Sequence, residues 1–176
     1  MIECGQENGP WLTYWINPVC MTLAVLGTFL LARKIAGSFA GVVAMILLAV
    51  SPVTLTLTNN PNSHASTTCC VVWGMYFLLQ WWERGGKTFA VASGFLLGFA
   101  ATIRYTEGLL ILPILCVIGF KIADFGLRIT DWRRRGAMLF RNPKSAIRNS
   151  IEFIFILCAW AFPLVVLVCF NLHWFG

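Results

Sequence analysis

Charged side chains are scarce in this sequence of 176 residues. Only 11% of the residues are Asp, Glu, Lys or Arg, whereas 59% are hydrophobic. A soluble domain typically carries about 25% charged and about 45–50% apolar residues. No polar stretch is long enough to form a separate water-soluble domain. The composition therefore excludes an ordinary soluble domain and indicates a chain that lies mostly in a membrane.

Sequence motifs for several kinds of chemistry are also missing. The chain has no Walker-type glycine loop, no dinucleotide-binding glycine motif and no CxxC pair. All of its seven cysteines except Cys4 stand inside apolar runs, where a free thiol behaves as a small hydrophobic group. We therefore expect no disulfide framework and assign no metal ligands, and a requirement for a divalent metal stays open.

Six apolar runs make up most of the chain, and each is apolar around its whole circumference, as in helices surrounded by lipid. They lack the period of two that membrane barrel strands show. The runs are Trp15–Leu31, Phe39–Leu57, Ala65–Trp82, Thr88–Ile103, Leu109–Ala123 and Phe153–Phe170. We predict an all-α membrane protein with a bundle of about six transmembrane helices, forming one partial domain over residues 1–176. The fourth and fifth runs are short, and a re-entrant hairpin is the alternative for them.

The basic residues predict how the helices are oriented in the membrane. If the N-terminus lies outside, every one of the 13 Lys and Arg residues except Arg104 falls on an inner connection. Such an excess is typical of the cytoplasmic side. We predict that residues 121–150 form a basic cytoplasmic loop against anionic membrane lipid. Topology thus accounts for the net charge of +6, and no nucleic acid is expected as a partner.

Polar side chains gather on the outer connections in this topology. Asn62 and His64 precede the third helix, and Arg104, Tyr105 and Glu107 follow the fourth. We predict a polar site at this surface, because these connections close over the same end of the bundle. No charged residue falls in the middle of a run, which argues against an ion-coupled transport path.

Arg104 has two interpretations. A guanidinium can bind a phosphate in bidentate fashion. It can also be an interfacial anchor paired with Glu107 three residues later, and residue type alone favours the anchor. Residue type also favours His64 as a loop histidine beside an N-cap residue, Ser63, over a ligand-binding one.

The run from Ala92 to Gly108, ASGFLLGFAATIRYTEG, resembles a recurring segment of polytopic glycosyltransferases. In that segment a glycine-rich helix ends in a Thr-x-Arg turn, and an apolar helix containing a proline, here Pro113, follows. The resemblance covers roughly Trp11 to Gly176, and it is to the GT-C class near the protein mannosyltransferase and aminoarabinose transferase branch.

This resemblance implies a GT-C-like bundle that transfers a sugar from a polyprenyl-phosphate donor at the outer face of the membrane. Arg104 would contact the donor phosphate, with Asn62, His64, Tyr105 and Glu107 as a possible pocket. In these enzymes the catalytic acid lies in an outer loop before the matched region. We therefore expect that acid outside this chain, and the chain to be part of a longer enzyme.

Two other functions are compatible with the sequence. One is a transporter or flippase of a lipid-linked substrate, and the other is a non-catalytic membrane subunit that packs through Gly94 and Gly98. The compact loops and the lack of any Asn-x-Ser/Thr acceptor site favour a bacterial inner membrane.

Overall fold

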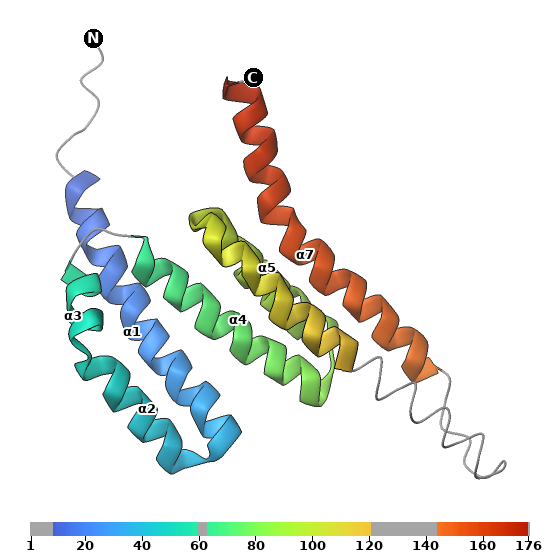
Figure 1. The fold of residues 1–176 in the computed structure, drawn as a ribbon, viewed down its shortest axis with the longest axis horizontal. Helices are drawn as coiled ribbons and strands as arrows, with labels where there is room; N and C mark the ends of the chain where they lie inside the picture. Colours follow the sequence, from blue (N-terminus) through green and yellow to red (C-terminus); the bar gives the residue numbers. More distant parts are fainter. Residues whose placement is uncertain (1–8, 60–62, 121–143, 176) are drawn as a thin grey trace.

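The computed structural model describes residues 9–59, 63–120 and 144–175, and every element in these ranges is a helix (Figure 1). This confirms the all-α prediction. The elements are α1 (Gly9–Ala36), α2 (Ser38–Val50), α3 (Pro52–Asn59), α4 (His64–Arg84), α5 (Lys87–Ile103), the 3-10 helix η1 (Tyr105–Leu110), an α-helical continuation of η1 over 111–120, and α7 (Lys144–Phe175).

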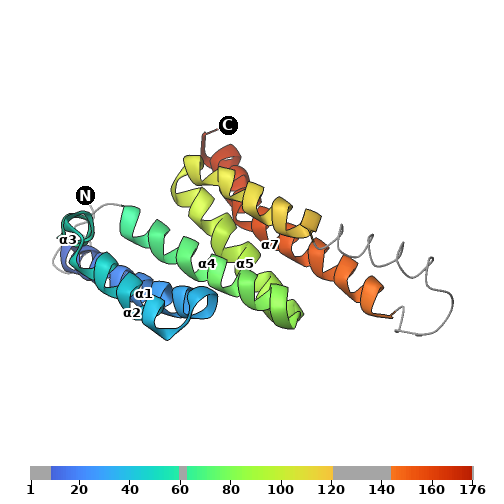
Figure 2. The same ribbon diagram turned by 60° about the horizontal axis from the view of Figure 1, so that its bottom comes forward.

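The helices stand side by side in the order α2, α1, α4, α5, α7 (Figures 1 and 2). Ile114 and Ile118 of helix 111–120 belong to the buried core, together with residues of α4, α5 and α7. We call the end of the bundle that holds the start of α4 and the end of α5 the Arg104 end. The opposite end, where α1 and α4 finish and α5 begins, is the Lys34 end.

The second predicted span is two helices in the structure. The chain leaves helical geometry at Ser51 (φ −57°, ψ 130°), between α2 and α3. Pro52 explains the break, because its ring disfavours the helical conformation of the residue before it and it has no N–H to continue the ladder. The helix restarts at Pro52, since the first helical position needs no intrahelical N–H bond.

Large apolar side chains cover much of the outside of the described helices. Phe39 is 84% exposed, and Leu47, Leu109 and Phe120 are about two-thirds exposed or more. A soluble monomer rarely shows contiguous apolar patches of this kind. The segments Trp15–Ala36 and Glu152–Trp174 are long and apolar enough to cross a membrane, and α2, α5 and Tyr105–Phe120 are shorter apolar helices. The chain is an all-α membrane protein.

Helix α5 runs antiparallel to α4 along nearly its whole length. Gly74, in the middle of α4, faces Leu97 of α5. Farther on, the turn Gly85–Gly86 joins the two helices at the Lys34 end, and a contact between His64 and Arg104 joins them at the Arg104 end.

Two glycines let α5 approach α7 closely. A Cβ built on Gly94 would lie 2.3 Å from the carbonyl oxygen of Ile156, and one built on Gly98 would lie 2.1 Å from that of Trp160. Both neighbours are backbone atoms, so no side-chain rotation could relieve the clash. Gly94 and Gly98 thus form the small-residue packing face predicted from their spacing of four, and the face is used within the chain.

A buried hydrogen bond fastens the Lys34 end of α7. The indole Nε1 of Trp81 donates to the carboxylate of Glu152 across 2.9 Å, and Glu152 is only 2% exposed. Trp81 is fully buried and also packs edge-on against Phe153. Glu152 directly precedes the predicted apolar run Phe153–Phe170. Helix α7 begins at Lys144, so Glu152 lies two turns inside it.

We predict that Gly98→Ala lowers the free energy of unfolding in detergent by about 1–3 kcal/mol, because α5 and α7 must separate to admit the methyl group. Gly119→Ala is the matched control, since a Cβ there meets nothing within 4 Å. Unfolding midpoints of the two variants measure the difference. Equal midpoints would contradict the close approach.

Replacing Trp81 by Phe tests the buried hydrogen bond. The phenyl ring removes the donor to Glu152 and fills only part of the space of the fully buried indole, and we expect a loss of about 1–3 kcal/mol in unfolding free energy. Trp15→Phe, at a residue that is 69% exposed, should change it by a few tenths at most. The same unfolding assay checks both variants, and a neutral Trp81→Phe would show that the bond adds nothing to stability.

Candidate functional site

Arg104 and His64 meet at the Arg104 end of the bundle. A guanidinium nitrogen of Arg104 contacts Nδ1 of His64, across 40 residues of sequence, and both side chains are half-buried. The sequence placed these residues on the same surface but not in contact. The structure therefore brings together two of the five residues predicted for the site.

Arg104 reaches His64 because the chain changes direction at the end of α5. Arg104 is extended (φ −141°, ψ 114°) and caps α5, with its N–H donating to the Ala100 carbonyl across 3.0 Å. The N–H of Glu107 then donates to the Arg104 carbonyl across 2.9 Å and starts η1. Because of this turn, the Arg104 side chain lies next to His64, the first residue of α4.

The remaining predicted residues have different positions. Tyr105 is 91% exposed and points away from the protein interior. Glu107 is half-buried in η1. Within the part of the chain that the structure describes, no ion pair joins Glu107 to Arg104, so the predicted Arg104–Glu107 anchor pair is not formed. Asn62 lies outside the described residues.

The electrostatics around His64 favour an anion. His64 is the first residue of α4, a helix of 21 residues, so the unbonded N–H groups of the first turn and the positive end of the helix dipole lie beside it. Arg104 adds a full positive charge. Together these groups are suited to a phosphate or carboxylate. Among the described residues no group of three or more His, Cys, Asp or Glu side chains could hold a metal ion.

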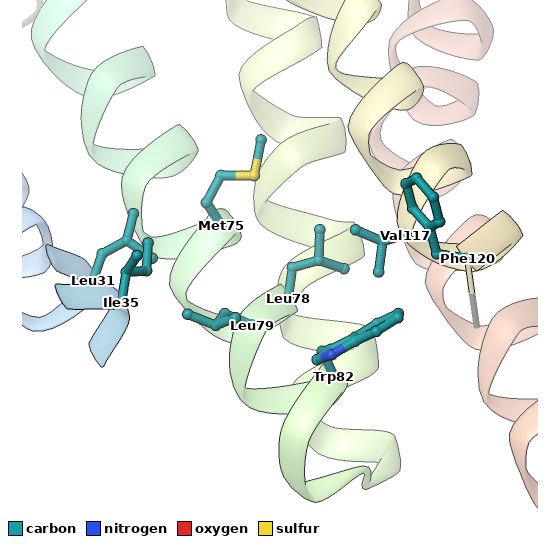
Figure 3. A pocket seen from close by; sticks show the side chains of 8 residues that line it. All are labelled: Leu31, Ile35, Met75, Leu78, Leu79, Trp82, Val117 and Phe120. Atoms are coloured by element: carbon teal, nitrogen blue, oxygen red, sulfur yellow. The ribbon is translucent and has the colours of Figure 1, made fainter. Parts of the chain in front are cut away.

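A cavity of about 720 Å³ lies at the Lys34 end, far along α4 from Arg104. Its walls come from α1, α4 and helix 111–120, and all the lining side chains are largely hydrocarbon (Figure 3). They are Leu31, Ile35, Met75, Leu78, Leu79, Trp82, Val117 and Phe120. The cavity can take hydrocarbon, but its lining has no charged group for a sugar phosphate.

Sequence reasoning missed two polar contacts at the Lys34 end. Lys34 pairs with Glu83 across 2.9 Å and links α1 to α4. Glu152 accepts the Trp81 bond described above. Glu83 and Glu152 each stand next to an apolar run, at a position where a helix end is expected. Glu152 is inside a helix because α7 starts already at Lys144, and no pattern in the sequence indicates this early start. These contacts act on helix packing, at the end opposite to the anion-binding groups.

Comparison with known proteins identifies one family. The family model described as dolichyl-phosphate-mannose-protein mannosyltransferase matches residues 6–141. The match includes α1 to α5, the turn at Arg104 and helix 111–120. Searches of curated proteins and of solved structures gave no match. Because the matched region covers more than half of the chain, the chain belongs to the dolichyl-phosphate-mannose-protein mannosyltransferase family.

Proposed function

We propose that this chain is the membrane core of a glycosyltransferase that takes a sugar from a polyprenyl-phosphate donor at the outer face of the membrane. Family membership supports transfer of a sugar over the alternative of lipid transport. The observation that carries the proposal is the contact between Arg104 and His64. It puts an arginine and a histidine together at the one end of the bundle where basic residues are otherwise rare.

In this proposal Arg104 binds the donor phosphate. The guanidinium has five N–H donors, and they can turn from the neutral ring nitrogen of His64 to phosphate oxygens. Its half-buried position makes each such bond stronger than one in open water. As the sugar leaves the donor, negative charge develops on the phosphate, and a fixed cation there stabilises the transition state.

The reaction also needs a group that activates the acceptor. Glu107 is the one acid among the described residues of the Arg104 end, and it lies in η1 after the turn. We assign it to the wall of the pocket with Tyr105 and Asn62. The catalytic acid belongs, in this proposal, to a part of the enzyme outside this chain.

The proposed membrane arrangement follows from where the charges lie. Arg33, Lys34, Arg84 and Lys87 all stand at the Lys34 end. We assign this end to the cytoplasm and the Arg104 end to the outer face, in a multi-pass protein of a bacterial inner membrane. The donor phosphate would then meet Arg104 in the outer leaflet.

Arg104→Ala in the intact enzyme should lower sugar transfer by about 100-fold or more, because an interaction with charge that grows in the transition state is lost. Protein level in the membrane should be unchanged. Arg84→Ala, an exposed arginine at the opposite end, is the matched control and should retain normal turnover. Normal turnover of Arg104→Ala would refute its role as a phosphate contact.

The proposed orientation predicts which cysteines an impermeant thiol reagent can reach in intact cells. Thr106 and Thr88 are both exposed, and they lie at opposite ends of the bundle. In a background with all seven native cysteines replaced by Ser or Ala, Thr106→Cys should be labelled, and Thr88→Cys should be labelled only after the membrane is permeabilised. The reverse pattern would show that the orientation is wrong.

A further inference from the structure

We infer that His64 is a proton-sensitive partner of Arg104: it is neutral in the empty site and gains a proton when a phosphate ester binds. The inference rests on the proposed function, in which Arg104 contacts the donor phosphate. It adds a second cation to the site and makes the binding of the anion depend on pH.

The state of the empty site follows from the contact itself. A guanidinium has only donors, so the nitrogen of His64 that it meets, Nδ1, must be an acceptor. A neutral imidazole has one acceptor nitrogen, and its single proton is then on Nε2. An imidazolium has protons on both nitrogens and would be repelled by Arg104. The contact therefore corresponds to a neutral His64 with its proton on Nε2.

A bound phosphate reverses this preference. Its oxygens are better acceptors for Arg104 than a neutral ring nitrogen is, since both partners are then charged. Nδ1 of His64 loses its donor, and a nearby negative charge favours the imidazolium. The ring can take one proton and donate it in a hydrogen bond to the phosphate. The one bond formed is the N–H bond on the ring, the proton comes from hydronium or the buffer acid, and no bond of the phosphate ester breaks.

Among the described residues, Arg104 is the main electrostatic neighbour of His64. The described parts of α1 and α3 hold no charged residue near this end, since Arg33 and Lys34 stand at the other end of α1. Beyond Arg104, η1 contributes Tyr105, which is exposed, and Glu107. His173 is exposed near the end of α7. Only Arg104 has a contact with the His64 ring among these groups.

The binding of farnesyl methyl phosphate to the full chain in lipid nanodiscs tests the inference. This phosphodiester keeps a single negative charge at every pH used, so any proton taken up comes to the protein. Calorimetry between pH 5.5 and 8, in two buffers of different ionisation enthalpy, counts the protons. We expect uptake of up to one proton and a Kd that rises by up to about tenfold per pH unit where an imidazole titrates.

Matched variants locate the proton. His64→Asn should bind with a Kd that does not change with pH and should take up no proton. His173→Asn, which removes the other histidine, should behave as the wild type. Wild-type binding that is independent of pH and takes up no proton would overturn the inference, as would loss of the pH dependence in His173→Asn alone.

Arg104→Ala separates this inference from the proposed function. If Arg104→Ala abolishes binding while the wild type takes up no proton, the phosphate site stands and the role of His64 is wrong. If Arg104→Ala binds the diester as tightly as the wild type, the phosphate site itself is wrong. Unfolding midpoints of all variants, compared with the wild type, show that each protein is folded in the assay.

Discussion

The close approach of α5 and α7 at Gly94 and Gly98 is the constraint on which the rest of the structure depends. Water cannot drive helices together inside a membrane, so contact between backbones supplies much of the attraction. Helix α5 touches α4 on one side and α7 on the other. Contacts on both sides therefore fix the position of α5. Arg104, the C-cap of α5, is thereby placed next to the start of α4.

The two ends of the bundle carry different kinds of side chain. The Lys34 end has an ion pair, a buried indole–carboxylate bond and an apolar cavity, all of which act on packing. The Arg104 end has a guanidinium, an imidazole and a helix N-terminus, which together suit an anion. In the proposed function, the hydrocarbon tail of the donor stays in lipid and its phosphate contacts Arg104.

Much of the fold was predictable because lipid imposes simple rules. Long apolar runs without a period of two predict helices, and every described element is a helix. The break at Ser51 was missed, although Pro52 signals it, because the run stays apolar on both sides. The start of α7 was also missed, since most residues from Lys144 to Ser150 are polar and the stretch forms no apolar run.

The site was predictable only in part. Residue types placed Arg104 and His64 at one surface, and the family resemblance drew attention to Arg104. Their contact depends on the turn after Ile103 and on the register between α4 and α5, which composition does not reveal. Glu107 looked like the partner of Arg104 from its spacing, but that spacing rule holds in an α-helix, and the chain there is first extended and then a 3-10 helix.

The most direct test of the account is a measurement of phosphorus–nitrogen dipolar coupling by solid-state NMR. The protein would be labelled with ¹⁵N in arginine, and a prenyl phosphate would be bound to it in lipid. The account predicts coupling between the phosphorus and a guanidinium signal that disappears in Arg104→Lys. Coupling that persists in Arg104→Lys, or that is absent from the wild type with ligand bound, would contradict it.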